Sequence, residues 1–324
     1  MPTSMRIATF NLENLDDKPT TKPPIATRAA LMQGQLTRVN ADILCLQEVN
    51  SDTALDTLIA ATPYAAYNRF STNNSAALNH GAPQNVVLLS RFPITSSEEV
   101  LHKFNPGPVY QLQTALPPAT AAQPISWTRS ILHSQVQLPS GQTLHVISFH
   151  LKSKLPFNIP GQKQAVPGSS FGMWKNASAF AEGSFISSML RTGQALEARQ
   201  LVDSLFDADA SALIVVCGDF NAEAGEVPLA ALHGDVEDTD NPSLSNRVLV
   251  PCENTIPEQA RYSLIHHGKG TMIDHILVSR SLLALYRGAE IHNEVLHDES
   301  SAFATDTKFP ESDHAPVVAR FELP

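Results

Sequence analysis

The chain has 324 residues, 43% of them hydrophobic and 17% charged, which is enough apolar material to bury a large core. The formal net charge is −10, from 22 basic and 32 acidic side chains. Because neutralisation of phosphates supplies most of the affinity of a nonspecific duplex-DNA binder, this balance disfavours a protein that binds DNA through a broad basic face. It does not exclude nucleic acid, since a bound divalent cation reverses the local field where a phosphate docks.

Composition also limits the setting in which the protein works. No stretch approaches the roughly 18 uninterrupted apolar residues that cross a membrane, and no apolar leader follows Met1. We therefore expect a cytoplasmic protein with no membrane insertion and one α/β domain over residues 1–324. Cys45, Cys217 and Cys252 are too few for a disulfide framework and are expected to be reduced packing residues.

Apolar runs and their periodicity predict alternating strands and helices along the chain. The predicted strands cover residues 5–10, 43–47, 86–89, 131–137, 144–149, 212–217, 271–278 and 315–321. The predicted helices start near residue 27, near residue 55, around residues 195–205 and at residue 228. A hairpin at 131–149 among these helices indicates a mixed α/β protein rather than a doubly wound parallel sheet.

Three further segments are predicted to be irregular. Residues 71–84 and 111–124 lack periodicity and are expected to be a loop and a surface excursion. Residues 155–183 form the longest stretch without a repeating pattern. A loop of that length in a compact domain faces the substrate or decorates the surface, and we favour the first.

The run that ends in Gly218-Asp219-Phe220-Asn221 is the most informative stretch of the chain. Residues 212–217 are apolar and β-branched, as in a strand buried on both faces. Asp219 and Asn221 then lie two positions apart, which places both side chains on one side of an extended chain. Taken alone, such a pair more often caps a turn than binds a ligand.

Other predicted strand ends carry similar groups. Together they present Asn11, Glu48, His150, Asp219 with Asn221, Asp274, and Asp313 with His314. Carboxylate and amide oxygens without a thiolate set suit Mg²⁺ or Mn²⁺ better than zinc. Histidines and carboxylates on one rim also suit hydrolysis of phosphate esters. Any one of these residues could instead be a turn former or a surface group.

The order of six short motifs makes the chain resemble the endonuclease/exonuclease/phosphatase superfamily, which includes deoxyribonuclease I and the sphingomyelinases. The motifs, which extend from residue 8 to 316, are Ala8-Thr9-Phe10-Asn11, Leu46-Gln47-Glu48, Ser148-Phe149-His150-Leu151-Lys152, Gly218-Asp219-Phe220-Asn221, Ile273-Asp274-His275-Ile276-Leu277 and Ser312-Asp313-His314-Ala315-Pro316. The fold that this resemblance implies is a four-layer α/β sandwich, with two mixed sheets face to face and helices outside.

The resemblance also implies where a cation and the water would bind. Glu48 would bind a catalytic Mg²⁺ or Mn²⁺, with Asn11 and Asp313 near it. Asp219 would orient or deprotonate the attacking water, and Asn221 would hold a phosphate oxygen.

For the histidines, the resemblance implies two roles. His314 would contact the scissile phosphate or act as general base, with Asp274 bonded to its other ring nitrogen. His150 would stabilise the transition state or protonate the leaving group. Which group is the base stays open.

A neighbouring histidine is expected to be structural. Along a strand His275 points away from Asp274, so both cannot face one site, and His266 and His267 precede a turn at residues 268–270.

The first functional hypothesis is a metal-dependent phosphodiesterase or nuclease with a phosphoester substrate, nucleic acid being the first candidate, and no protein partner is implied. His150 stands where apurinic endonucleases have a Tyr-centred motif, which argues against a role on abasic DNA. The alternatives are a phosphatase or sphingomyelinase-like enzyme acting on small phosphorylated molecules or phospholipid headgroups, and a catalytically silent binding module.

Overall fold

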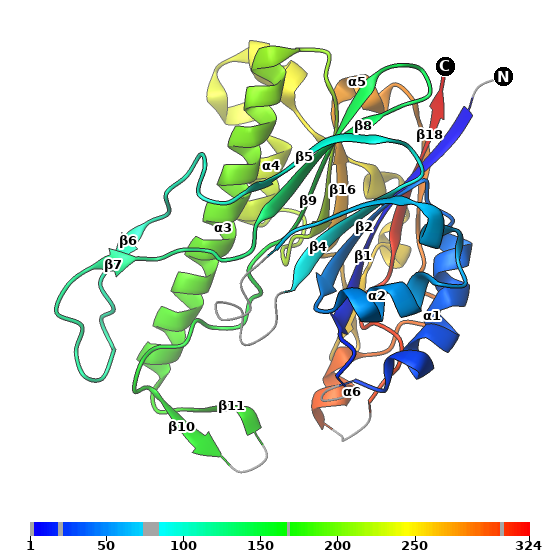
Figure 1. The fold of residues 1–324 in the computed structure, drawn as a ribbon. Helices are drawn as coiled ribbons and strands as arrows, with labels where there is room; N and C mark the ends of the chain where they lie inside the picture. The colour runs from blue at the N-terminus through cyan, green and yellow to red at the C-terminus, as the bar shows by residue number, and fades with distance from the viewer. Residues whose placement is uncertain (1–2, 19–21, 74–83, 167–168, 305–307) are drawn as a thin grey trace.

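Two six-stranded mixed sheets form the centre of the protein in the computed structural model, which describes residues 3–18, 22–73, 84–166, 169–304 and 308–324 (Figure 1). Sheet A contains, in spatial order, β17 (Tyr286–Ile291), β18 (Val317–Leu323), β1 (Thr3–Leu15), β2 (Ile43–Val49), β4 (Asn85–Ser90) and β3 (Asn68–Ser71). Sheet B contains β13 (Val250–Pro251), β16 (Asp274–Val278), β12 (Leu213–Asp219), β9 (Thr143–His150), β8 (Ile131–Gln137) and β5 (Ile94–Val100). In each sheet the central pair, β1–β2 or β12–β9, is parallel and the flanking pairs are antiparallel.

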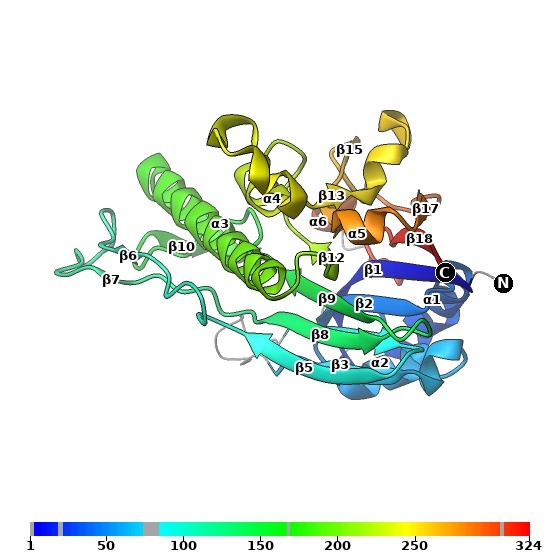
Figure 2. The ribbon, with the colours of Figure 1, turned by 90° about the horizontal axis from the view of Figure 1, so that it is seen from above.

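Helices cover the outer face of each sheet (Figure 2). The α-helices are α1 (Ile25–Val39), α2 (Asp52–Ile59), α3 (Ala177–Ala208), α4 (Val227–His233), α5 (Arg280–Leu283) and α6 (Glu299–Ala304). Apolar residues of α1 and α2 pack on sheet A, and those of α3 and α4 pack on sheet B. Short 3₁₀ helices lie in the connections: η1 (Pro63–Ala66), η3 (Glu237–Thr239), η4 (Pro242–Arg247), η5 (Cys252–Thr255) and η6 (Glu258–Ala260). The predicted four-layer sandwich is confirmed.

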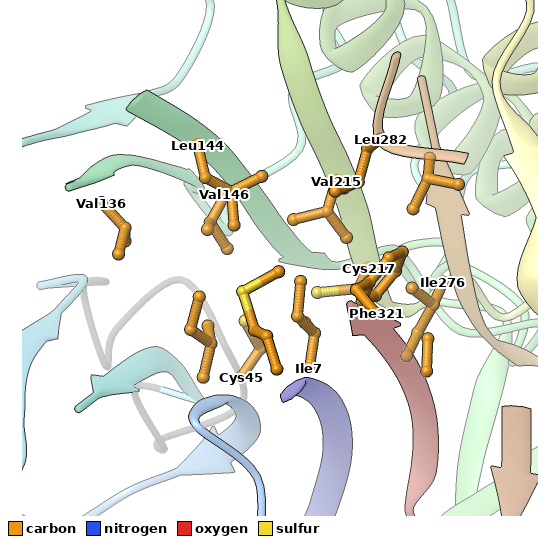
Figure 3. Close-up of a cluster of buried hydrophobic side chains, with 14 of the residues drawn as sticks. Ile7, Cys45, Val136, Leu144, Val146, Val215, Cys217, Ile276, Leu282 and Phe321 are labelled. Atoms are coloured by element: carbon orange, nitrogen blue, oxygen red, sulfur yellow. The ribbon is translucent and has the colours of Figure 1, made fainter. Parts of the chain in front are cut away.

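The two sheets meet in an apolar layer, which we call the seam. Because side chains alternate along a strand, every second residue of the inner strands enters this layer. Ile7 and Cys45 of sheet A face Val146 and Cys217 of sheet B there (Figure 3). Cys45, Cys217 and Cys252 are buried and free, as predicted. No helix in the described part of the chain is both long and apolar enough to cross a bilayer.

Most predicted strands are present, with small shifts at their ends. The first strand continues past Phe10 to Leu15, and the strand predicted at 271–278 begins at Asp274 because Thr271 belongs to β15 (Lys269–Thr271), which pairs with β14 (Leu264–His266). Edge strands β3, β5 and β17 were not predicted. The predicted loop at 71–84 falls largely outside the described residues, since 74–83 are not described.

The prediction of a loop over residues 155–183 was wrong in its second half. This segment contains the paired strands β10 (Lys163–Val166) and β11 (Ser169–Trp174), and α3 already begins at Ala177. The Asn176 side chain accepts a hydrogen bond from the backbone N–H of Ala179 at 2.8 Å, which caps the helix. The predicted surface excursion at 111–124 is present and ends in β7 (Gln123–Pro124), which pairs with β6 (Val109–Tyr110).

Candidate functional site

The four central strands of the two sheets end beside one another. Asn11 and Glu48 lie on the parallel pair β1–β2, and His150 and Asp219 are cross-strand neighbours at the end of β9 and β12. The Asn11 amide nitrogen donates to Glu48 Oε1 at 3.2 Å and to Asp219 Oδ2 at 3.0 Å. One amide therefore joins the carboxylates of the two sheets, at the strand ends where ligands of α/β proteins collect.

Strand alternation brings most of these groups to the seam, but it does not explain Glu48. In β2 Leu44 and Leu46 face the helices, so a regular strand would point Glu48 the same way. Glu48 instead has a left-handed φ of 60°, and its second oxygen accepts the backbone N–H of Asn14 at 2.8 Å. This local turn directs the carboxylate to Asn11 and His150.

Gly218 allows β12 to approach β9 closely just before Asp219. Its φ is 144°, and a Cβ atom at this position would lie 2.0 Å from the carbonyl oxygen of Phe149. Only glycine fits that spacing without moving a strand. The Gly-Asp pair of the sequence motif thus has a steric cause next to the site.

His150 is buried and neutral. Its Nε2 lies 3.3 Å from Asp219 Oδ2 and 3.8 Å from Glu48 Oε1, and its Nδ1 has no hydrogen-bond partner among the described residues. Burial, followed by the charges of Arg129 and His314, holds the pKa of His150 well below its ordinary value. The ring is therefore uncharged at neutral pH and can accept a proton or donate through one nitrogen.

His314 has the opposite electrostatic setting. Its Nδ1 lies 2.7 Å from Asp274 Oδ2, while its Nε2 lies 4.0 Å from Asp219 Oδ2 and 3.9 Å from Asp313 Oδ1. Burial disfavours the charged ring, but Asp274 above all, then Asp219 and Asp313, raise the pKa of His314 well above its ordinary value. The site therefore contains one neutral and one positively charged imidazole.

Ser312 fixes the position of His314 relative to β1. Its hydroxyl donates to the Asn11 carbonyl at 2.7 Å and accepts the His314 backbone N–H at 3.1 Å. The motif that precedes β18 is thereby bound to the end of β1, far away in sequence.

Asn221 lies beside Asp219 in a left-handed turn with φ of 47°. Its backbone N–H donates to Asp219 Oδ1 at 2.8 Å, and its side-chain amide donates to Asp219 Oδ2 at 3.2 Å and to the Leu151 carbonyl at 3.1 Å. In this arrangement the amide orients the Asp219 carboxylate and ties two strand ends together.

Carboxyl groups are crowded at this end of the seam. Burial, followed by the neighbouring Asp313, raises the pKa of Glu13 to about 7, and burial followed by Asp274 raises the pKa of Asp219 to about 7. Burial also raises the pKa of Asp313 to about 6, and its Oδ1 is buried without a partner among the described residues. Among the described lysines and arginines, only Lys22 forms an ion pair with one of these three carboxyls, that of Glu13. Such a set of hard, undercompensated oxygens fits a divalent cation such as Mg²⁺ or Mn²⁺.

Ligand atoms of Asp219, Asp274 and His314 also lie within 4.8 Å of one another, a spacing that would suit a metal ion. Two of these three residues are joined by the 2.7 Å Asp274–His314 hydrogen bond. That bond uses Asp274 Oδ2 and His314 Nδ1, and it leaves Asp274 Oδ1 and His314 Nε2 facing the site.

Two arginines near the site were not anticipated from the sequence, which gives no motif for them. Arg28 is fully buried in α1 and donates to the carbonyls of Leu12 at 2.6 Å, Glu13 at 3.1 Å and Pro310 at 2.9 Å. It therefore holds the irregular end of β1 to the segment before His314. Arg129 donates to the Leu151 carbonyl at 3.0 Å, beside the turn that follows His150.

The other histidines singled out in the sequence lie outside the site. His275 faces the helix side of sheet B, where it contacts Glu253 at 2.5 Å. His266 is half exposed and pairs with Glu299 at 2.6 Å.

Comparisons with known proteins identify the family and the fold of the chain. Residues 8–314 match the Endonuclease/Exonuclease/phosphatase family. Among solved structures, the chain resembles truncated TDP2 of Caenorhabditis elegans, with 15% identity, a TM-score of 0.58 and 98% of each chain covered. It also resembles an endonuclease/exonuclease/phosphatase family protein of Bacteroides thetaiotaomicron, with 16% identity, a TM-score of 0.57 and coverage of 100% of this chain and 99% of the other.

A third similar structure is D. rerio TDP2 complexed with a single strand DNA product, with 17% identity, a TM-score of 0.56 and coverage of 98% of this chain and 99% of the other. A search among curated proteins finds no match. The solved structures share the fold, and the family match extends over nearly the whole chain. This chain belongs to the endonuclease/exonuclease/phosphatase family.

Proposed function

We propose that this protein is a divalent-metal-dependent phosphodiesterase. The proposal is supported by the convergence of Glu48, His150, Asp219 and His314. These residues come from strand ends of both sheets and from the segment before β18, and the polar atoms of contacting side chains lie 3.3 to 4.0 Å apart. Because the site draws on residues 11 to 314, we propose that residues 1–324 are one catalytic domain. Free buried cysteines fit the predicted cytoplasmic location.

The cation would be held by Glu48 and Asp313, with Asn11 beside them. When bound, Mg²⁺ or Mn²⁺ would neutralise charge that develops on the phosphoryl group. Asn11 donates to Glu48 and Asp219, so it would hold the carboxylate that binds the cation next to the carboxylate that positions the water. Asp313 offers a buried oxygen, Oδ1, that accepts no hydrogen bond from the described residues.

The remaining groups divide between the water and the phosphate. Asp219, oriented by Asn11 and Asn221, would position the attacking water and receive its proton, with neutral His150 at 3.3 Å as its partner. Charged His314, held by Asp274, would donate from Nε2 to a phosphoryl oxygen in the transition state. The different pKa values of the two histidines support this division of acid and base roles.

For the substrate, we propose nucleic acid. The similarity to a TDP2 structure that holds a single strand DNA product supports this choice.

A metal-dependent substrate panel tests the proposal. The purified protein should cleave bis(4-nitrophenyl) phosphate and labelled oligonucleotides with Mg²⁺ or Mn²⁺ and stop when EDTA is added. Asp219→Asn should lose activity by about 10³-fold or more, whereas Asp56→Asn, which removes a surface charge bound to Arg69, should keep it. Turnover of monoesters or phosphocholine lipids alone would favour the phosphatase or sphingomyelinase-like alternative. Silence with every cation would favour the binding module.

A further inference from the structure

Two long connections leave sheet B at the end of the strands where His150 lies. Strand β8 runs antiparallel to both β5 and β9, so β5 and β9 point the same way and both end there. The described chain that follows each strand, residues 101–130, 151–166 and 169–190, forms a projection that we call the arm. It contains β6, β7, β10, β11 and the first turns of α3, and it extends from one side of the sheets (Figures 1 and 2).

The arm is built as a packed unit. Trp127, Ile159, Ile186 and Leu190 form its own apolar core. The buried Glu182 carboxylate accepts hydrogen bonds from the Gln113 N–H at 2.5 Å, the Thr114 N–H at 2.8 Å and the Tyr110 hydroxyl at 3.2 Å, and these bonds join the two connections. The arm therefore presents a fixed surface next to the catalytic rim.

The charge of the arm opposes that of the rest of the protein. Residues 100–181 contain no aspartate or glutamate, although the chain has a net charge of −10. Their lysines and arginine are Lys103, Arg129, Lys152, Lys154, Lys163 and Lys175. Two of these are neutralised, Lys103 by Glu98 and Lys154 by Glu226. The other three lysines form no ion pair with a carboxylate in the described ranges.

Several aromatic rings of the arm are at least partly exposed, and one of them lies beside Lys163. The Lys163 ammonium lies 4.7 Å from the centre of the Trp174 ring, and Phe180 meets that ring edge-on at 5.9 Å. Phe180 is 48% exposed and Phe185 50% exposed, and Tyr110 contacts Phe185 at 5.6 Å. Exposed rings cost free energy in water unless something covers them.

We propose that the arm binds single-stranded nucleic acid, whose phosphates meet Lys163 and Lys175 and whose bases stack on the exposed rings. A polyanion complements a surface whose one acidic side chain, Glu182, is buried, and an unpaired base offers the flat partner that an exposed Phe ring needs. The arm begins directly after His150, so a strand bound there continues into the catalytic rim. That this strand is also the substrate rests on the proposed phosphodiesterase function, whereas its binding does not.

Fluorescence anisotropy of a labelled oligothymidylate tests the binding, with the full chain in EDTA to prevent cleavage. The double variant Lys163→Glu/Lys175→Glu should weaken binding by about tenfold or more and reduce its dependence on salt. Phe180→Ala with Phe185→Ala should weaken it by about tenfold. Arg280→Glu, a single charge reversal at the other end of sheet B, should leave it unchanged. Thermal melting verifies that each variant is folded.

The proposal would be overturned if the arm variants bound the oligonucleotide as tightly as the Arg280 control, or if loss of both phenylalanines left the affinity unchanged. It would also be overturned if the protein bound a duplex as tightly as the single strand. The same holds if the arm variants lost binding only to phosphatidylserine-containing vesicles. Hydrolysis of bis(4-nitrophenyl) phosphate separates this proposal from the function. Arm variants should keep that activity, and an inactive protein whose arm still binds the oligonucleotide would refute the function alone.

Discussion

Strand β16 carries the same chemical pair on both of its faces, a histidine bonded to a carboxylate. On the helix side, His275 Nδ1 lies 2.5 Å from Glu253 Oε1, and its Nε2 lies 2.8 Å from the Ala222 carbonyl. On the seam side, Asp274 Oδ2 lies 2.7 Å from His314 Nδ1, and the ion-pair contacts of His314 Nε2 with described residues are to carboxylate oxygens at 3.9 and 4.0 Å.

The second ring nitrogen separates the two pairs. In His275 both nitrogens are occupied by protein, so the pair can only hold η5 against sheet B. In His314 one nitrogen is left for a substrate oxygen. A carboxylate–histidine pair in a sequence is thus ambiguous until the partner of that second nitrogen is known.

The largest effect should follow removal of the seam-side ring. His314→Ala should lower kcat on bis(4-nitrophenyl) phosphate, per folded molecule, by about 10²–10⁴-fold, the usual contribution of an acid–base group. His275→Ala should lower the urea midpoint, because it leaves the buried Glu253 unpaired, and should keep its turnover per folded molecule. Loss of activity per folded molecule in His275→Ala would break the distinction.

A smaller loss is expected when the seam-side ring stays but loses its partner. Asp274→Asn should lower kcat/KM by about 10–100-fold. Because Asp274 is the strongest of the groups that raise the pKa of His314, the alkaline limb of the pH–rate profile should move to lower pH. An unshifted limb would mean that His314 does not titrate in that limb.

On the helix side, the expected effect is on stability. Glu253→Gln should lower the free energy of unfolding by about 3 kcal/mol, since it breaks a buried ion pair. Turnover per folded molecule should stay the same. Urea denaturation measures this effect, and Glu322→Gln, which removes an exposed partner of Arg287, is the control and should be nearly neutral.

The smallest effect is the pH dependence of that stability. Although burial opposes it, Glu253 raises the pKa of His275 above its ordinary value. A raised folded-state pKa gives stabilisation that is complete below the unfolded-state pKa of about 6.5 and is lost as pH rises through the folded value. The difference in unfolding free energy between the wild type and Glu253→Gln should therefore shrink from pH 6 to pH 9. A difference that grows with pH would show that His275 is neutral in the folded protein.

The sequence allowed a good prediction of the central strands, because their apolar runs are buried on both faces. It also allowed the opposite orientations of Asp274 and His275 to be predicted, since strand alternation is a local rule. The edge strands β5 and β17 were missed because half-exposed edges show no continuous apolar run. The start of α3 was missed because its packing partners, such as Trp127, come from a distant connection.

In the site, the residues could be named but not their local geometry. Alternation alone would direct Glu48 to the helices, and only the left-handed backbone at that residue reverses it. Arg28 escaped attention because a buried arginine that binds four carbonyls has no sequence signature. The roles predicted for the eight site residues stay predictions until the variants are measured.

Asn11 has a mechanical consequence as well as a chemical one. Contacts between methyl groups resist separation of the two sheets but hardly resist lateral sliding, because dispersion has little directional preference. The Asn11–Asp219 bond at 3.0 Å, with Gln47 donating to Ser148 at 3.4 Å one layer deeper, spans the interface and is directional. These two bonds oppose sliding of one sheet over the other, so the reacting groups should stay aligned when the helical layers on either side fluctuate thermally.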